Sequence, residues 1–160
     1  MSNSSLNAPA RTAVEQCMNL QPGESCAIVT DDERKAIAEA LYTVASGITD
    51  ETVMLRYPPG EQHGEEPPEP VSAAIAESDV VLAPTTKSLS HTTARVDATE
   101  AGARMATLPG ITDGVFLMGL DADYERIRAE CANVLEQVED AEEIRVTSPQ
   151  GTDITFETGD

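Results

Sequence analysis

Lysine, aromatic residues and positive charge are scarce in this sequence of 160 residues. It has no tryptophan, three tyrosines and two phenylalanines, and its only lysines are Lys35 and Lys87. Ten Lys and Arg residues stand against 29 Asp and Glu residues, which gives a formal net charge of −19. Proteins bind nucleic acids by neutralising phosphates with basic side chains. Because no basic stripe is present, we expect no nucleic-acid partner.

Signals for membranes, export and disulfides are absent as well. No apolar run is long enough to cross a bilayer and no signal peptide is present, so we expect no membrane partner and, by default, a cytoplasmic location. The three cysteines, Cys17, Cys26 and Cys131, are far apart and form no CxxC pair. We expect buried free thiols rather than a disulfide framework.

The acidic composition itself indicates an environment. A large negative charge destabilises a compact chain by self-repulsion, and salt screens this repulsion, since the Debye length is about 3 Å at 1 M. Abundant Asp and Glu with scarce Lys favour a protein from a salt-loving cell over an ordinary acidic cytosolic protein.

Short apolar runs alternate with helical patterns along the chain, which is typical of a parallel α/β sheet. We predict a single α/β domain over residues 1–160, with a mostly parallel, Rossmann-like sheet and helices on both faces. The final pair of strands predicts a possible antiparallel hairpin at the carboxyl end. The expected strands are 25–30, 52–57, 80–83, 104–107, 144–147 and 153–156, and the expected helices are 10–20, 36–44, 71–77, 92–101 and 121–140.

A polar loop follows the expected strand 80–83, and it is the most informative stretch of the sequence. Strand ends that open a helix are where open α/β sheets bind ligands, and helix N-termini favour anions. Alternatively, Ser90 or Thr92 only caps the helix, and Lys87 pairs with a nearby carboxylate. The stretch 107–112 should lie beside this loop if both strands are parallel. The candidate ligand-binding residues are Thr85, Thr86, Lys87, Ser88, Ser90 and His91.

Metal binding is the other chemistry to weigh, because His63 lies among Glu61, Glu65 and Glu66. We favour a solvated, flexible acidic loop there. Metal ligands must converge on the ion at about 2.0–2.2 Å, and His63 and His91 follow different strands. We predict no stoichiometric transition metal.

Three stretches resemble a known family: Glu61–Pro70 (EQHGEEPPEP), Ala83–Thr92 (APTTKSLSHT) and Leu108–Thr112 (LPGIT). They are similar to the amino-terminal half of leucyl aminopeptidases of the aminopeptidase T type, in a halophilic version. The relatives of that metallopeptidase family include an iron-dependent dihydroxypyridine dioxygenase. The resemblance runs from about Ala10 to the carboxyl end.

The resemblance implies an α/β half that shapes the substrate cleft or the dimer of a hydrolase. In that family the metal ligands lie in the carboxyl-terminal half, so a divalent zinc, cobalt or iron ion is expected only there. No cofactor and no catalytic residue are then expected in this chain, and residues 1–160 alone should not hydrolyse peptides. The expected partners are a peptide or small anionic ligand, and a second copy or a catalytic domain. The alternative is a self-sufficient domain that binds a small anion at Thr85–His91.

Overall fold

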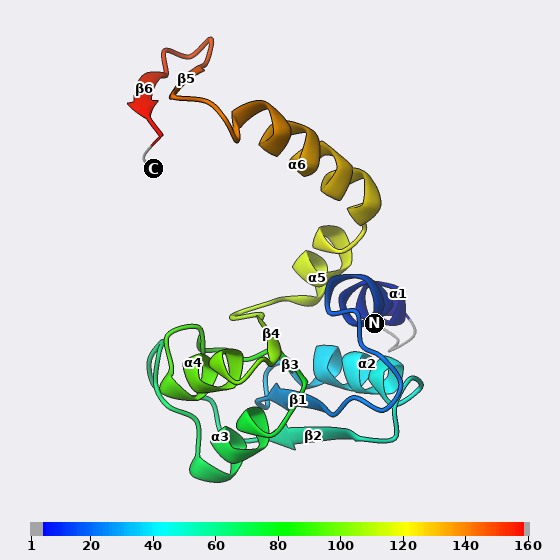
Figure 1. Ribbon diagram of the computed structural model, residues 1–160. Coiled ribbons are helices and arrows are strands. Elements are labelled where there is room, and N and C mark those ends of the chain that lie inside the picture. The colour runs from blue at the N-terminus through cyan, green and yellow to red at the C-terminus, as the bar shows by residue number, and fades with distance from the viewer. Residues whose placement is uncertain (1–4, 159–160) are drawn as a thin grey trace. The chain divides into compact units, whose positions relative to one another are not determined.

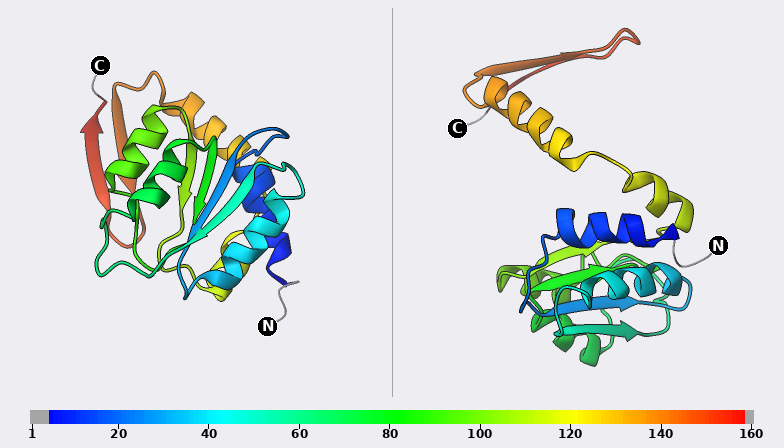
Figure 2. Two further views of the ribbon diagram at one scale, coloured as in Figure 1. Left: turned by 90° about the horizontal axis from the view of Figure 1, so that it is seen from below. Right: turned by 90° about the vertical axis from the view of Figure 1, so that its right-hand side faces the viewer.

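The computed structural model describes residues 5–158 and contains the predicted parallel sheet. The strands are β1 (Cys26–Thr30), β2 (Thr52–Arg56), β3 (Val80–Ala83) and β4 (Arg104–Thr107). They lie in the order β2-β1-β3-β4, and every neighbouring pair is parallel. The fold class predicted from the sequence is therefore confirmed, and the strands lie side by side in Figure 2.

Helices cover both faces of this sheet. One face carries α1 (Asn7–Arg11), a π-helical segment η2 (Thr12–Cys17), α2 (Lys35–Ala45) and α5 (Asp113–Gly119). The other face carries α3 (Glu69–Ala76) and α4 (Thr93–Glu100). In Figure 1, α4 lies to the left of β3 and α2 lies to its right. The sequence did not predict α5, and it predicted one continuous helix where α1 and η2 lie.

The central strands supply both cores because successive side chains point to opposite faces. Ile28 and Leu82 pack with α1, α2 and α5, whereas Val29 and Val81 pack with α3 and α4. All residues of β1 and β3 are buried. Strands buried on both faces need continuous apolar runs rather than alternation, which explains why the sequence predicted them well.

The direction in which the chain adds strands reverses between β1 and β3. From β1 the chain crosses through α2 to β2 on one side, and from β3 it crosses through α4 to β4 on the other. Such a reversal is a topological switch point, and ligands of open α/β folds bind at the carboxyl ends of the strands there. The fold therefore places the polar loop after β3 at this position.

Residues 123–160 form a second compact unit, separate from residues 1–122. It contains α6 (Tyr124–Val138) and a hairpin of β5 (Glu143–Thr147) and β6 (Asp153–Glu157), which pair antiparallel as predicted. None of the residues of α6 is buried. The expectation of buried thiols is wrong for Cys131 and for Cys17, which are exposed, and correct for Cys26. The apolar face of α6 does not lie in a core within the described residues.

Within residues 5–158, no helix is both long enough and apolar enough to cross a membrane.

Candidate functional site

Asp31 lies at the carboxyl end of β1 and ties that strand to the polar loop after β3. It is buried, with 1% of its surface exposed. Its carboxylate accepts hydrogen bonds from the Thr86 backbone N–H, from Thr86 Oγ1 at 3.1 Å and from the Glu33 N–H at 3.1 Å. Beside it, Thr30 Oγ1 donates to the Pro84 carbonyl at 2.9 Å. Asp31 is not the N-cap residue of α2, which is Arg34.

The polar loop has a fixed shape made by its own hydroxyl groups. Thr85 Oγ1 donates to the Lys87 carbonyl at 2.6 Å, and Ser88 Oγ bonds both the Ser90 hydroxyl and the Ser90 N–H. Ser90 Oγ also lies 2.7 Å from Thr107 Oγ1. The Gly110 N–H donates to the Thr85 carbonyl at 2.8 Å. The stretch 107–112 therefore lies beside the loop, as expected for two parallel strands.

The start of α4 already holds a carboxylate of this chain. Thr92 is the helix cap, because its Oγ1 accepts from the Arg95 N–H at 3.2 Å. The Thr93 and Ala94 N–H groups both donate to the Glu66 carboxylate. The bond from Thr93 lowers the pKa of Glu66. The helix N-terminus that favoured an external anion is thus filled by Glu66.

The acidic loop that carries His63 is exposed, as expected, and it is also hydrogen-bonded to the polar loop. The Ser88 N–H donates to His63 Nδ1 at 3.0 Å, and the Gly64 N–H donates to the Ser88 carbonyl at 2.8 Å. Gly64 has φ +82°, and a Cβ there would lie 3.9 Å from the Cβ of His91. The two histidine-bearing loops therefore lie side by side.

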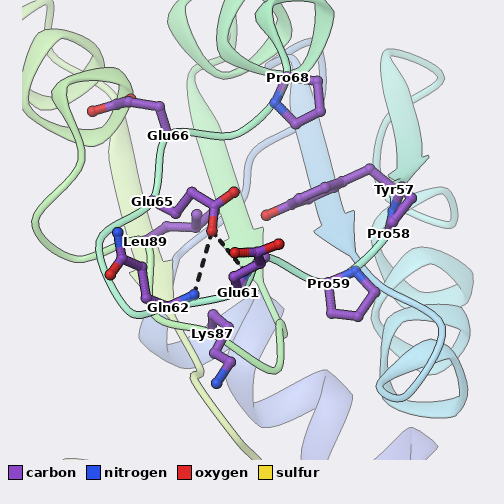
Figure 3. Close-up of a pocket in the computed structure, with 11 residues that line it drawn as sticks. Tyr57, Pro58, Pro59, Glu61, Gln62, Glu65, Glu66, Pro68, Lys87 and Leu89 are labelled. Carbon is purple, nitrogen blue, oxygen red and sulfur yellow. Dashed lines mark hydrogen bonds between the residues drawn. The ribbon is translucent and has the colours of Figure 1, made fainter.

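A pocket of about 400 Å³ opens between these two loops (Figure 3). Its volume is typical of small-molecule sites. Tyr57 enters it from the end of β2, and the Tyr57 hydroxyl points toward the carboxylates of Glu61 and Glu65. Glu65 is held in place because it accepts from the Glu61 N–H at 2.7 Å and from the Gln62 N–H at 3.3 Å. The lining residues are Tyr57, Pro58, Pro59, Gly60, Glu61, Gln62, Glu65, Glu66, Pro68, Lys87 and Leu89.

The pocket combines neutral and charged hydrogen-bonding groups. Burial raises the pKa of Tyr57 to about 12, helped by the negative charges of Asp31 and Glu65. Its phenol is therefore a neutral donor at physiological pH. Lys87 also lines the pocket, and no carboxylate of the described residues forms an ion pair with it. The ion-pair alternative for Lys87 is thus not what the structure has.

Of the six residues predicted to bind a ligand, only Lys87 lines this pocket. The hydroxyl groups of Thr85, Ser88 and Ser90 form hydrogen bonds within the loop. The Thr86 hydroxyl donates to Asp31 at the end of β1. His91 is exposed at the end of the loop. The sequence missed Tyr57, and it considered Glu61 and Glu65 only as possible metal ligands beside His63. The sequence signal for these residues was the polar stretch that follows strand β2.

A metal centre is not assembled by the residues that the structure describes. In residues 5–158, no group of three or more His, Cys, Asp or Glu side chains is placed to hold a metal ion.

Comparison with known proteins identifies the family. The NicX family, described as 2,5-dihydroxypyridine 5,6-dioxygenase, matches residues 6–160. The chain belongs to the 2,5-dihydroxypyridine 5,6-dioxygenase family. Its fold is also similar to the structure of 2,5-dihydroxypyridine dioxygenase from Pseudomonas putida KT2440, with a TM-score of 0.68 and 18% sequence identity. That match covers 99% of this chain and 48% of the other, so the chain spans about half the length of that protein. A search of curated proteins found no match.

Family membership corrects the assignment made from the sequence. The predicted identity as an aminopeptidase T domain is wrong, and so is the hydrolase class that it implied, because the matching family is a dioxygenase family. Only the stated kinship with a dihydroxypyridine dioxygenase fits in part. The alternative, a self-sufficient anion-binding domain at Thr85–His91, does not fit the dioxygenase match either. The physical reason is that Glu66 of this chain already occupies the start of α4, where an external anion was expected to bind.

Proposed function

We propose that this protein acts in the oxidative cleavage of a dihydroxylated pyridine or a closely related ring, and that residues 5–158 bind and orient the ring. The family match over residues 6–160 carries the proposal. The pocket at the carboxyl edge of the sheet supports it, because that edge is where α/β folds place ligands.

The pocket suits a flat, polar, uncharged ring better than a peptide. Leu89 and the prolines 58, 59 and 68 give it apolar walls. Tyr57 offers a phenol hydrogen, Lys87 offers an ammonium group, and Glu61 and Glu65 offer carboxylate oxygens. A dihydroxypyridine carries hydroxyl groups that donate and accept and a ring nitrogen, so each of these groups has a counterpart. Polar groups placed in this way give a pocket its specificity.

Positioning is the role that we assign to these residues. An oriented ring meets its reaction partner in a productive geometry, which lowers the barrier by avoiding an entropy loss. Non-haem iron oxygenases hold iron with two histidines and a carboxylate, and the described residues assemble no such group. We therefore assign no step of dioxygen chemistry to them.

Calorimetric titration with 2,5-dihydroxypyridine under argon, in molar potassium chloride, tests this function. Wild type should bind one ring per chain, and Tyr57→Phe should weaken binding about fivefold, the worth of one hydrogen bond of about 1 kcal/mol. Lys87→Met should also weaken it, whereas Lys35→Met is the matched control and should bind as wild type does. No heat of binding, or equal losses for the two lysine variants, would contradict the proposal.

A cytoplasmic location also stays a proposal, and the free state of Cys17, Cys26 and Cys131 agrees with it.

A further inference from the structure

His63 and Gly64 hold both backbone polar groups of Ser88. The Ser88 N–H donates to His63 Nδ1 at 3.0 Å, and the Ser88 carbonyl accepts from the Gly64 N–H at 2.8 Å. Ser88 is in turn the residue that organises the polar loop, because its hydroxyl bonds Ser90 twice. A single contact of His63 therefore links the acidic loop to the internal bonding of the polar loop.

The direction of this contact makes it sensitive to protonation. A backbone N–H can only donate, so Nδ1 of His63 acts as the acceptor and carries no proton. A protonated imidazole carries hydrogen on both nitrogens and accepts nothing. The Ser88 N–H would then face another N–H group and lose its partner.

We propose that His63 is a pH-sensitive clasp: when neutral it accepts the Ser88 N–H and joins the acidic loop to the polar loop, and when protonated it loses this one contact. This inference goes beyond the proposed function, since it concerns the conformation of the two loops whatever they bind. Histidine is the side chain whose charge ordinarily changes between pH 5 and 8.

Two carboxylates beside the clasp already have hydrogen-bond partners of their own. Glu65 and Glu66 are already bonded to backbone N–H groups. The bond from Thr93 lowers the pKa of Glu66, so its contribution is present above the ordinary carboxyl range and is lost only below it. The Glu66 contact to α4 therefore persists at pH 5. The other charged or titratable groups of the two loops and their supports include Tyr57, Glu61, Lys87, His91, Asp31 and Arg95.

Amide hydrogen exchange of the full chain, followed by NMR in molar potassium chloride, tests the clasp. Protection of the Ser88 N–H, corrected for the intrinsic exchange rate, should fall about tenfold or more from about pH 8 to about pH 5. The Thr93 N–H, which is bonded to Glu66, serves as the internal reference and should change little. Equal Ser88 protection at both pH values would overturn the proposal.

Three variants separate the clasp from a general effect of pH. His63→Ala should remove Ser88 protection at both pH values. His63→Asn places a non-titrating oxygen at the same number of bonds from Cα as Nδ1, and should retain protection at both. His91→Ala is the matched control from the neighbouring loop and should behave as wild type does. Loss of the pH response in His91→Ala, or its persistence in His63→Asn, would assign the response to another group and overturn the proposal.

Discussion

Replacing Asp31 by alanine should loosen the carboxyl edge of the sheet more than any other single loop substitution. The carboxylate is buried and accepts two backbone N–H groups, from Thr86 and Glu33, and one hydroxyl hydrogen from Thr86. A hydrogen bond to a charged group contributes about 1.5–3 kcal/mol. Counting only the two backbone donors at the low end, we expect Asp31→Ala to lose about 3 kcal/mol of unfolding free energy.

Urea unfolding followed by circular dichroism, at constant molar potassium chloride, measures this loss. Asp32→Ala is the matched control, because Asp32 is the next residue and its pair with Arg56 is exposed. Exposed ion pairs contribute below about 1 kcal/mol, so the control should unfold close to wild type. If Asp31→Ala and Asp32→Ala lose the same free energy, the proposed role of Asp31 in joining β1 to the polar loop is wrong.

Three further predictions concern thiols, acid and salt. Burial raises the pKa of Cys26 to about 12, whereas Cys17 and Cys131 are exposed. A disulfide reagent should therefore modify two thiols quickly and Cys26 only after unfolding. Rapid modification of all three thiols would contradict the buried position of β1. The hydrogen bond from Arg104 lowers the pKa of Glu24 from its ordinary 4.5, so the stability that this pair contributes is present above that value and is lost as the pH falls through the lowered pKa. Wild type should therefore lose more stability than Arg104→Met on acidification from about pH 6 to about pH 3, by about 1 kcal/mol or less for so exposed a pair; equal losses would refute this. The melting temperature should be roughly 10 °C higher in molar potassium chloride than in dilute buffer, because salt screens several kcal/mol of self-repulsion and each kcal/mol shifts the melting temperature by about 2–4 °C. Equal melting temperatures in the two solutions would remove the reason to regard the protein as adapted to salt.

The parts of the fold that could be predicted from the sequence are those whose residue pattern has a single physical cause, such as burial on both faces of a strand. Val80–Ala83 is apolar throughout because β3 is buried on both faces, and β1 is likewise buried and is apolar up to Val29. The helix α5 was missed because it has seven residues, with glycines at positions 114 and 119 that weaken its pattern. On α6 the periodicity correctly marked an apolar face, but periodicity does not say what covers a face. Ile127, Val134 and Leu135 are exposed there.

The site was harder to predict because its contacts join distant residues. Asp31 and Thr86 are 55 positions apart, and His63 and Ser88 are 25 apart. The pattern after β3 located the polar loop, but it did not show that the loop from the end of β2 folds against it. The short motifs also led to the wrong family, because stretches such as Leu108–Thr112 report a fold shared by proteins with different chemistry.

NMR mapping of the ring-binding surface tests the central claim most directly. The full chain, labelled with ¹⁵N, would be titrated with 2,5-dihydroxypyridine under argon in molar potassium chloride. We predict saturable shifts confined to the amides of residues 57–66 and 85–91, which surround the pocket. The absence of saturable shifts, or shifts centred on α6 instead, would contradict the assignment of ring binding to this edge of the sheet.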